Sequence, residues 1–399
     1  MSPPPPWSDI PLELAGLVLG PLPAHADRVR FAAVCPRWRA AAHEVWPMPP
    51  PLPLLALPDD GTMYSPPLRQ PFRLPATAAG FNAACGSWLL FSGTDGGCFL
   101  RNPFSNATVP LPALHRIRKR CKGRSGGQPI VSTWETNDSS KKLSVRRLLL
   151  CSPHLVAAYV VLGSCLDDGI GGLSYMAVCQ PGAGSWWSVC MDDSLISEEY
   201  IVPTLAAMAF HKGTLFAVER YRGHFYTVDI GVDQSTGDPW VSRFRRVIPG
   251  SIPTGSRPST IIPHGLGIME TQYQYQWGQL GEQLLVPTGW KEFEVFEADF
   301  QESRWTKLAT IGNDQVLFLS QDYCASLCVA HLGMPGDRIV FAENRRGSWY
   351  EEESIGSCSV YDMRDRKISA LQPMPLHSKH GTVRATWLFQ EEPAEAAAT

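Results

Sequence analysis

Residues 206–247 read AAMAFHKGTLFAVERYRGHFYTVDIGVDQSTGDPWVSRFRRV. Four apolar or alternating runs follow one another in this stretch, and turn-forming Gly, Asp and Pro residues separate them. Short runs that are rich in β-branched and aromatic residues and bounded by turn residues are typical of β-strands. The pattern therefore predicts one group of four strands, at residues 206–210, 214–218, 224–230 and 240–247.

Similar four-strand groups recur along the chain with a period of about 50–65 residues. We expect these further groups at residues 83–111, 145–190, 265–310 and 316–371. Within the group at 265–310, the first two strands are expected at residues 265–270 and 282–286. Repeated four-stranded sheets predict an all-β propeller, kelch-like and with about five or six irregular blades. A β-sandwich is the alternative that the strand pattern leaves open.

The two ends of this β-rich region are expected to meet. Its first strands are predicted at residues 52–57, 62–65 and 72–74, and its last strand at residues 384–389. If these strands share one blade, the ring closes and no sheet edge at the chain ends stays exposed.

The first fifty residues have helical rather than strand periodicity. Asp9 is a candidate N-cap for a first helix, with Pro11 in its first turn, where a missing N–H costs little. Two more short helices are expected, separated by a break at Cys35-Pro36. Residues 47–53, PMPPPLP, then favour the extended polyproline II conformation and are expected to form a stiff spacer.

This helical segment is small for an independent domain. A unit of about forty residues rarely buries enough apolar surface to fold by itself. Its large apolar residues also exceed the needs of one internal core, so some of them should face another surface. That surface is either the β-rich domain or a separate protein, and the stiff spacer favours a separate protein.

Five short motifs in the helical segment resemble an F-box. They are residues 10–14 (IPLEL), 18–19 (VL), 22–23 (LP), 29–31 (VRF) and 34–39 (VCPRWR). The F-box pattern runs Leu-Pro-x-Asp/Glu-Leu, an apolar helix, Leu-Pro, and a Val-Cys-x-x-Trp-Arg helix. Two departures are Ile10 in place of Leu and the loop at residues 24–27, which lacks the usual Leu near its centre.

Four motifs in the β-rich region are similar to the plant KIB-type domain, which commonly follows an F-box and whose expected fold is a β-propeller. They are residues 102–112, 210–218, 292–299 with Trp305, and 312–319. Together the two resemblances imply an α+β multidomain chain. The expected parts are a three-helix F-box at 7–46, the spacer at 47–53, the propeller at 54–390 and a disordered tail at 391–399.

The F-box resemblance implies a non-catalytic subunit of a cullin-based SCF ubiquitin ligase. The helices would dock to a Skp-type adaptor, and through it to a cullin, while the propeller captures a target protein for ubiquitination. The motifs imply these adaptor contacts: Pro11, Leu14, Leu17, Val18, Leu22, Pro23, Val34, Cys35 and Trp38. Trp38 is expected to contribute most, because large aromatic residues dominate such interfaces. Residues 115–140 and 251–263, the longest insertions, are the candidate substrate-binding loops.

Composition excludes several other classes of function. The net charge of −3 indicates no general affinity for nucleic acid or acidic membranes. Eleven cysteines without two-residue spacing indicate reduced thiols rather than a metal site. Residues 1–11 contain no Lys or Arg, so a signal peptide is not expected, and no apolar run is long enough to span a membrane. We expect no cofactor and a location in the nucleus, the cytoplasm or both.

Three features allow other interpretations. The basic run at residues 116–124 is a nuclear-import signal, a patch for an acidic partner, or a solvated loop. If the F-box has decayed, the chain is a propeller interaction protein that binds or sequesters a partner without degrading it. A propeller enzyme is a third possibility, because propellers host hydrolases built from distant residues.

Overall fold

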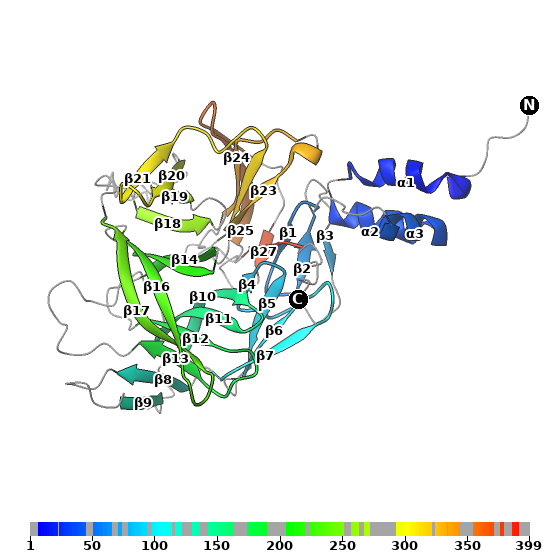
Figure 1. Cartoon of the computed structure of the whole chain (residues 1–399). Helices are drawn as coiled ribbons and strands as arrows, with labels where there is room; N and C mark the ends of the chain where they lie inside the picture. The colour runs from blue at the N-terminus through cyan, green and yellow to red at the C-terminus, as the bar shows by residue number, and fades with distance from the viewer. Residues whose placement is uncertain are drawn as a thin grey trace, which may run out of the picture. The chain divides into compact units, whose positions relative to one another are not determined.

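The computed structural model shows a mainly-β chain that begins with three short helices (Figure 1). The residues that it describes are 7–22, 24–44, 51–65, 71–73, 79–93, 97–113, 116–121, 130–135, 143–162, 174–189, 205–211, 213–219, 224–250, 257–262, 267–271, 293–320, 324–332, 334–343, 354–370, 376–378 and 385–390. The chain divides into two compact units. The first unit is Met1–Leu89, Arg101–Ala107 and Ile311–Thr399, and the second is Leu90–Leu100 and Thr108–Thr310.

The three predicted helices are present. A 3-10 turn, η1, precedes them, and the four elements are η1 (Trp7–Asp9), α1 (Leu12–Leu19), α2 (His25–Ala33) and α3 (Pro36–Glu44). The break expected at Cys35-Pro36 separates α2 from α3. The capping role predicted for Asp9 is wrong, because Asp9 ends η1 and Pro11 is the N-cap of α1. Pro11 has an extended backbone, with φ −55° and ψ 147°, and its carbonyl accepts the Ala15 N–H at 3.0 Å.

A small apolar core joins the three helices, which we call the helical module. Its buried members are Ala15 and Leu19 of α1, Phe31 of α2 and Ala41 of α3. Ala15 and Leu19 lie four residues apart and therefore on the same helix face. Four buried side chains are few for a folded unit, so the module depends on the half-buried residues that pack around them.

The second unit contains two sheets of four antiparallel strands in chain order. Their strands are β14 (Leu205–His211), β15 (Thr214–Glu219), β16 (Phe225–Val232) and β17 (Pro239–Ile248), and then β18 (Arg257–Ile262), β19 (Gly267–Thr271), β20 (Phe293–Asp299) and β21 (Arg304–Leu308). The first sheet confirms the group predicted from residues 206–247. In the second sheet the first strand is β18, which precedes the predicted one, and residues 282–286 lie outside the described residues.

A sheet of six strands also lies in the second unit. Its strands, in spatial order, are β10 (Leu143–Ser152), β11 (Leu155–Leu162), β12 (Ser174–Cys179), β13 (Trp186–Val189), β8 (Arg116–Cys121) and β9 (Ile130–Glu135). β10 to β13 confirm the predicted group at 145–190. β8 and β9 form an antiparallel pair that joins the sheet through a parallel pairing of β8 with β13.

The first unit contains the sheet that joins the two ends of the β-rich region. Its order is β28 (Thr386–Leu388), β1 (Leu54–Ala56), β2 (Thr62–Tyr64) and β3 (Pro71–Arg73). β28 pairs antiparallel with β1, with Leu55 opposite Trp387. The predicted pairing of the chain ends is therefore confirmed.

Two further sheets complete the described strands. One has the predicted order β4 (Ala83–Cys85), β5 (Trp88–Ser92), β6 (Cys98–Arg101) and β7 (Thr108–Leu111). The other has the order β23 (Cys324–Cys328), β22 (Gln315–Leu319), β24 (Arg338–Glu343), β25 (Ser354–Asp362) and β26 (Lys367–Ala370), and β27 (Leu376–Ser378) also pairs with β25. In this sheet β22 pairs in parallel with β24, which chain order alone does not indicate. The described strands thus form six sheets, in line with the predicted five or six blades.

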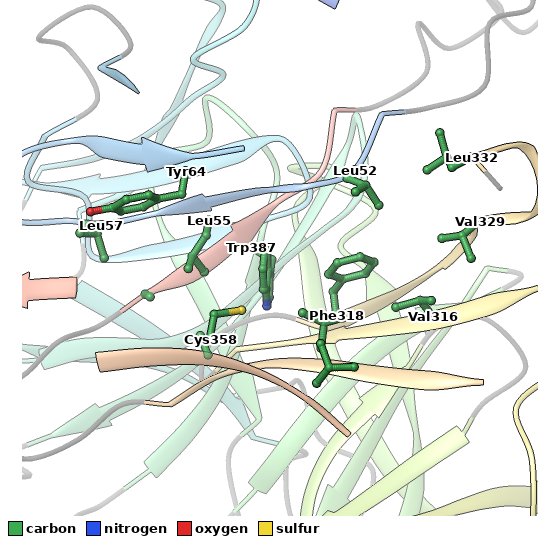
Figure 2. Packing of buried hydrophobic residues seen from close by; sticks show 14 residues of the cluster. Leu52, Leu55, Leu57, Tyr64, Val316, Phe318, Val329, Leu332, Cys358 and Trp387 are labelled. Carbon is green, nitrogen blue, oxygen red and sulfur yellow. The ribbon is translucent and has the colours of Figure 1, made fainter. Parts of the chain in front are cut away.

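The largest aromatic residue of the chain-end sheet lies in a well-packed core, shown in Figure 2. Trp387 of β28 is fully buried, and its ring centroid lies 5.2 Å from that of Phe318 on β22. Its indole N–H donates to the carbonyl oxygen of Leu319 at 2.8 Å. Leu55 of β1 and Cys358 of β25 belong to the same cluster. The last strand is therefore attached by main-chain pairing on one side and by side-chain packing on the other.

The two segments predicted to be substrate-binding loops are not simple loops. Residues 115–140 contain β8 and β9, and residues 251–263 contain β18. The described parts of both segments pair with neighbouring strands, so main-chain hydrogen bonds hold them within sheets.

Candidate partner-binding surface of the helical module

The outward face of α1 is apolar. Leu14, Leu17 and Val18 are 51%, 73% and 43% exposed, whereas Ala15 and Leu19 are buried. Positions i, i+3 and i+4 lie on one side of a helix, so the three exposed residues share a face. α1 thus uses one side for the core of the module and presents apolar side chains on the other.

Two more exposed apolar residues lie in and after α2. Val29 is 53% exposed on α2, and Val34, between α2 and α3, is 58% exposed. We call Leu14, Leu17, Val18, Val29 and Val34 the exposed apolar set. Trp7 in η1 is 74% exposed as well. Apolar side chains gathered in this way on a small unit are typical of an interaction surface.

Four of the nine predicted adaptor contacts belong to the exposed apolar set, namely Leu14, Leu17, Val18 and Val34. Pro11 is also exposed, at the start of α1. Pro23 lies outside the described residues. Val29 and Trp7 were not among the predicted contacts. Val29 lies within the VRF motif, which could have indicated it, whereas Trp7 precedes all the motifs.

The other three predicted contacts are part of the module's own packing. Leu22 is half-buried against the module core. The Cys35 sulfur accepts the backbone N–H of Trp38 at 3.4 Å, and so acts as a cap at the start of α3. Trp38 is half-buried, with its ring centroid 4.5 Å from that of Phe31. Its indole N–H donates to the Trp7 carbonyl oxygen at 3.1 Å. Trp38 therefore links η1, α2 and α3.

Basic side chains stabilise the connections between the helices. Arg28 is buried, and its Nε donates to the carbonyl oxygen of Leu22 at 2.8 Å. Burial lowers the pKa of Arg28. Arg39 of α3 donates to the Ala32 carbonyl near the end of α2, where a positive charge is favourable. Asp27 and Arg30 form an exposed ion pair at 3.1 Å within α2. The contacts of Arg28 and Arg39 hold together the helices that carry the exposed apolar set.

Cys85, Cys98, Cys151, Cys179 and Cys358 are buried and form no disulfide bond. Burial and the neighbouring Cys98 thiol raise the pKa of Cys179, which keeps that sulfur protonated and unreactive. Among the described residues no group of His, Cys, Asp and Glu has an arrangement that could hold a metal ion. None of the described helices combines the length and the apolar character needed to cross a membrane.

A propeller is indicated by the strand order, by the closing sheet and by the four motifs at residues 102–112, 210–218, 292–299 with Trp305, and 312–319. A family model described as the KIB1-4 β-propeller matches residues 54–362. The chain belongs to this family. The propeller half of the resemblance is therefore confirmed, and the β-sandwich alternative is wrong. A KIB1-4 β-propeller suggests a protein-interaction domain.

Comparisons with curated proteins and with solved structures add no information on function. No curated protein matches the chain. Among solved structures, a chain described as TolB from Agrobacterium tumefaciens is 12% identical, with 85% of this chain and 99% of that chain covered and a TM-score of 0.32. A chimera of ACO and RPE65 is 10% identical, with 77% and 74% covered and a TM-score of 0.25. Similarities this low do not bear on function.

Proposed function

We propose that this chain is the substrate-recognition subunit of a cullin-based SCF ubiquitin ligase. The helical module would dock to a Skp-type adaptor, and the KIB1-4 propeller would capture a target protein. The observation that carries the proposal is the exposed apolar set, which lies on helices whose own core is already formed by other residues. The F-box motifs coincide with these helices.

The energetics of the exposed apolar set suit a docking surface. Full burial of one Val or Leu side chain contributes about 1.5–3 kcal/mol. Leu14, Leu17 and Val18 lie on one helix face, so a groove on a partner can bury them together. While they are exposed to water, most of this surface contributes little to the stability of the module.

The proposed role requires no bond chemistry from this chain. A cullin and its RING partner would bring a ubiquitin-conjugating enzyme, and the propeller would hold a lysine of the target near the thioester. Raising the effective concentration of a reactant in this way accelerates a reaction without a catalytic residue. The proposed partners are thus a Skp-type adaptor, a cullin and a target protein, which places the chain in the nucleus, the cytoplasm or both.

Co-purification from cells tests the proposal. The full chain should carry a Skp-type adaptor and a cullin with it, whereas a Leu14→Ser, Leu17→Ser double variant should lose both proteins. Val232→Ser is the matched control, because Val232 is 64% exposed but lies on β16. The control should retain both partners.

The result also separates the proposal from a propeller that only binds or sequesters its partner. If the folded wild-type chain carries neither adaptor nor cullin, the helical module is not a working F-box and the ligase role fails. If it carries both, proteins captured by the propeller should have longer half-lives when the chain is removed.

A further inference from the structure

One sheet of the propeller carries an extension beyond its four consecutive strands. β10 to β13 pair in chain order, and β8 is added next to β13, followed by β9 at the edge. The parallel pairing places Arg118 opposite Trp187 and Ile117 opposite Trp186. Ile117 is fully buried, so β8 is anchored in the sheet and is not a solvated loop. The described part of the basic run at 116–124 thus has a defined position.

β8 is strongly basic. Four of its six residues are Arg or Lys: Arg116, Arg118, Lys119 and Arg120. On β9 the one acidic residue is Glu135, which lies opposite Arg116 in the register. The whole chain has a net charge of −3, so this concentration of positive charge is a local departure from its overall balance.

Arg118 and Trp187 form the centre of this basic region. The Arg118 guanidinium lies over the Trp187 ring, 5.3 Å from its centroid. Stacking on an aromatic ring restricts the guanidinium and leaves its N–H groups available to an acceptor. Trp187 itself is 5% exposed, and its indole N–H has no hydrogen-bond acceptor among the described residues. A cation and an unsatisfied buried donor therefore lie together.

A second basic strand lies beside the same part of the sheet. β17 packs against β13, and Val241 of β17 belongs to the same apolar cluster as Trp187. β17 carries three exposed arginines, Arg243, Arg245 and Arg246. Arg245 is paired with Asp229 at 2.9 Å. β13 thus has one basic strand paired to it and another packed against it.

We infer that β8, together with the neighbouring β13 and β17, binds a carboxylate-rich segment of a partner protein. Carboxylates complement several arginines at once and accept paired hydrogen bonds from a guanidinium. The inference rests on the proposed function, because it specifies the chemistry of the protein that the propeller captures. Of the three interpretations of the basic run at residues 116–124, the inference selects a patch for an acidic partner.

Binding of a fluorescein-labelled oligo-glutamate peptide to the full chain, measured by fluorescence anisotropy, tests this inference. The peptide should bind, and added salt should weaken the binding because exposed charges are screened. Arg118→Ala should weaken it about tenfold, since a charged hydrogen bond is lost. Arg118→Lys should retain part of the affinity, because the charge remains without the planar stacking.

The matched control is Arg304→Ala, an exposed arginine on β21 that should leave peptide affinity unchanged. The inference is overturned if an oligo-glutamine peptide binds equally well, if both Ala variants weaken binding alike, or if single-stranded RNA binds more tightly than the acidic peptide. Absence of peptide binding also overturns it. Adaptor co-purification with the same preparations shows separately whether the ligase role holds.

Discussion

The helical module and the propeller differ in how many of their large apolar side chains are exposed. Among the described residues, six of the nine large apolar side chains that are exposed lie between Trp7 and Val34. The other three, Val232, Phe300 and Ile368, are spread over three separate sheets or turns of the β-rich region. The module buries only four residues in its core.

This difference is what the proposed docking role of the helical module would require. Along the described strands, apolar side chains either alternate with polar ones or are buried on both faces of the sheet. Most large apolar residues of these strands therefore contribute to folding. The helices present an apolar face whose side chains are about half exposed or more. Exposed apolar surfaces of this kind are typical of interaction sites.

The largest effect is expected in the core of the propeller. Trp387→Ala removes the contact with Phe318 and the hydrogen bond to Leu319, and it weakens the attachment of the last strand. It should lower the free energy of unfolding by about 3–5 kcal/mol. Urea denaturation of the full chain measures this loss. Ile368→Ala, at an exposed position, should change the same quantity by less than about 0.5 kcal/mol. Equal effects would show that Trp387 does not join the chain ends.

A smaller and local effect is expected within the module. Trp38→Ala removes the stacking on Phe31 and the hydrogen bond to Trp7, and should destabilise the three helices by about 2 kcal/mol. Hydrogen exchange should become faster in α1 to α3 and stay unchanged in β22 and β24. Arg37→Ala, at an exposed position of α3, serves as the control. If strand amides also exchange faster, the module and the propeller are not independent.

The smallest effect concerns a surface carboxylate of the propeller. Partial burial tends to raise the pKa of Asp362, but the Arg364 backbone N–H and the Arg338 guanidinium, 3.1 Å away, lower it overall. A carboxylate with a lowered pKa in the folded state stabilises the fold above its unfolded pKa, and this contribution is lost as the pH falls through the folded pKa. Stability should therefore decrease between about pH 5 and pH 3, and less steeply in Asp362→Asn. Urea denaturation at the two pH values measures both slopes, and equal slopes would contradict the assignment.

Most of the strand groups could be predicted because their apolar runs are clearly bounded by turns. The pairing of β28 with β1 was also predictable, since an open ring would leave edges exposed. The strand β8 was not predicted, because four of its six residues are basic and the buried Ile117 alone does not produce an alternating apolar pattern. β18 was missed because Pro258 and the polar residues around it resemble a loop. The parallel pairing of β22 with β24 depends on packing that no local pattern records.

The candidate site was only partly predictable for a similar reason. Helical spacing identifies Leu14, Leu17 and Val18 as one face, but it does not say whether that face is buried. Cys35 and Trp38 also lie in the motifs that resemble an F-box, and in the structure they cap and join the helices, while their predicted contact with an adaptor stays a prediction. A sequence motif does not distinguish exposed residues from residues that pack within the module, because that depends on how the helices pack.

Titration of a purified Skp-type adaptor into the full chain by isothermal calorimetry measures whether the exposed apolar set binds the adaptor. Wild type, Leu17→Ser and Val232→Ser should unfold at the same temperature, because both substituted residues are exposed. Leu17→Ser should raise the Kd by about tenfold or more, while Val232→Ser should leave it unchanged. Equal affinity in all three proteins, or no binding by the folded wild type, would contradict the assignment of the exposed apolar set as a docking surface.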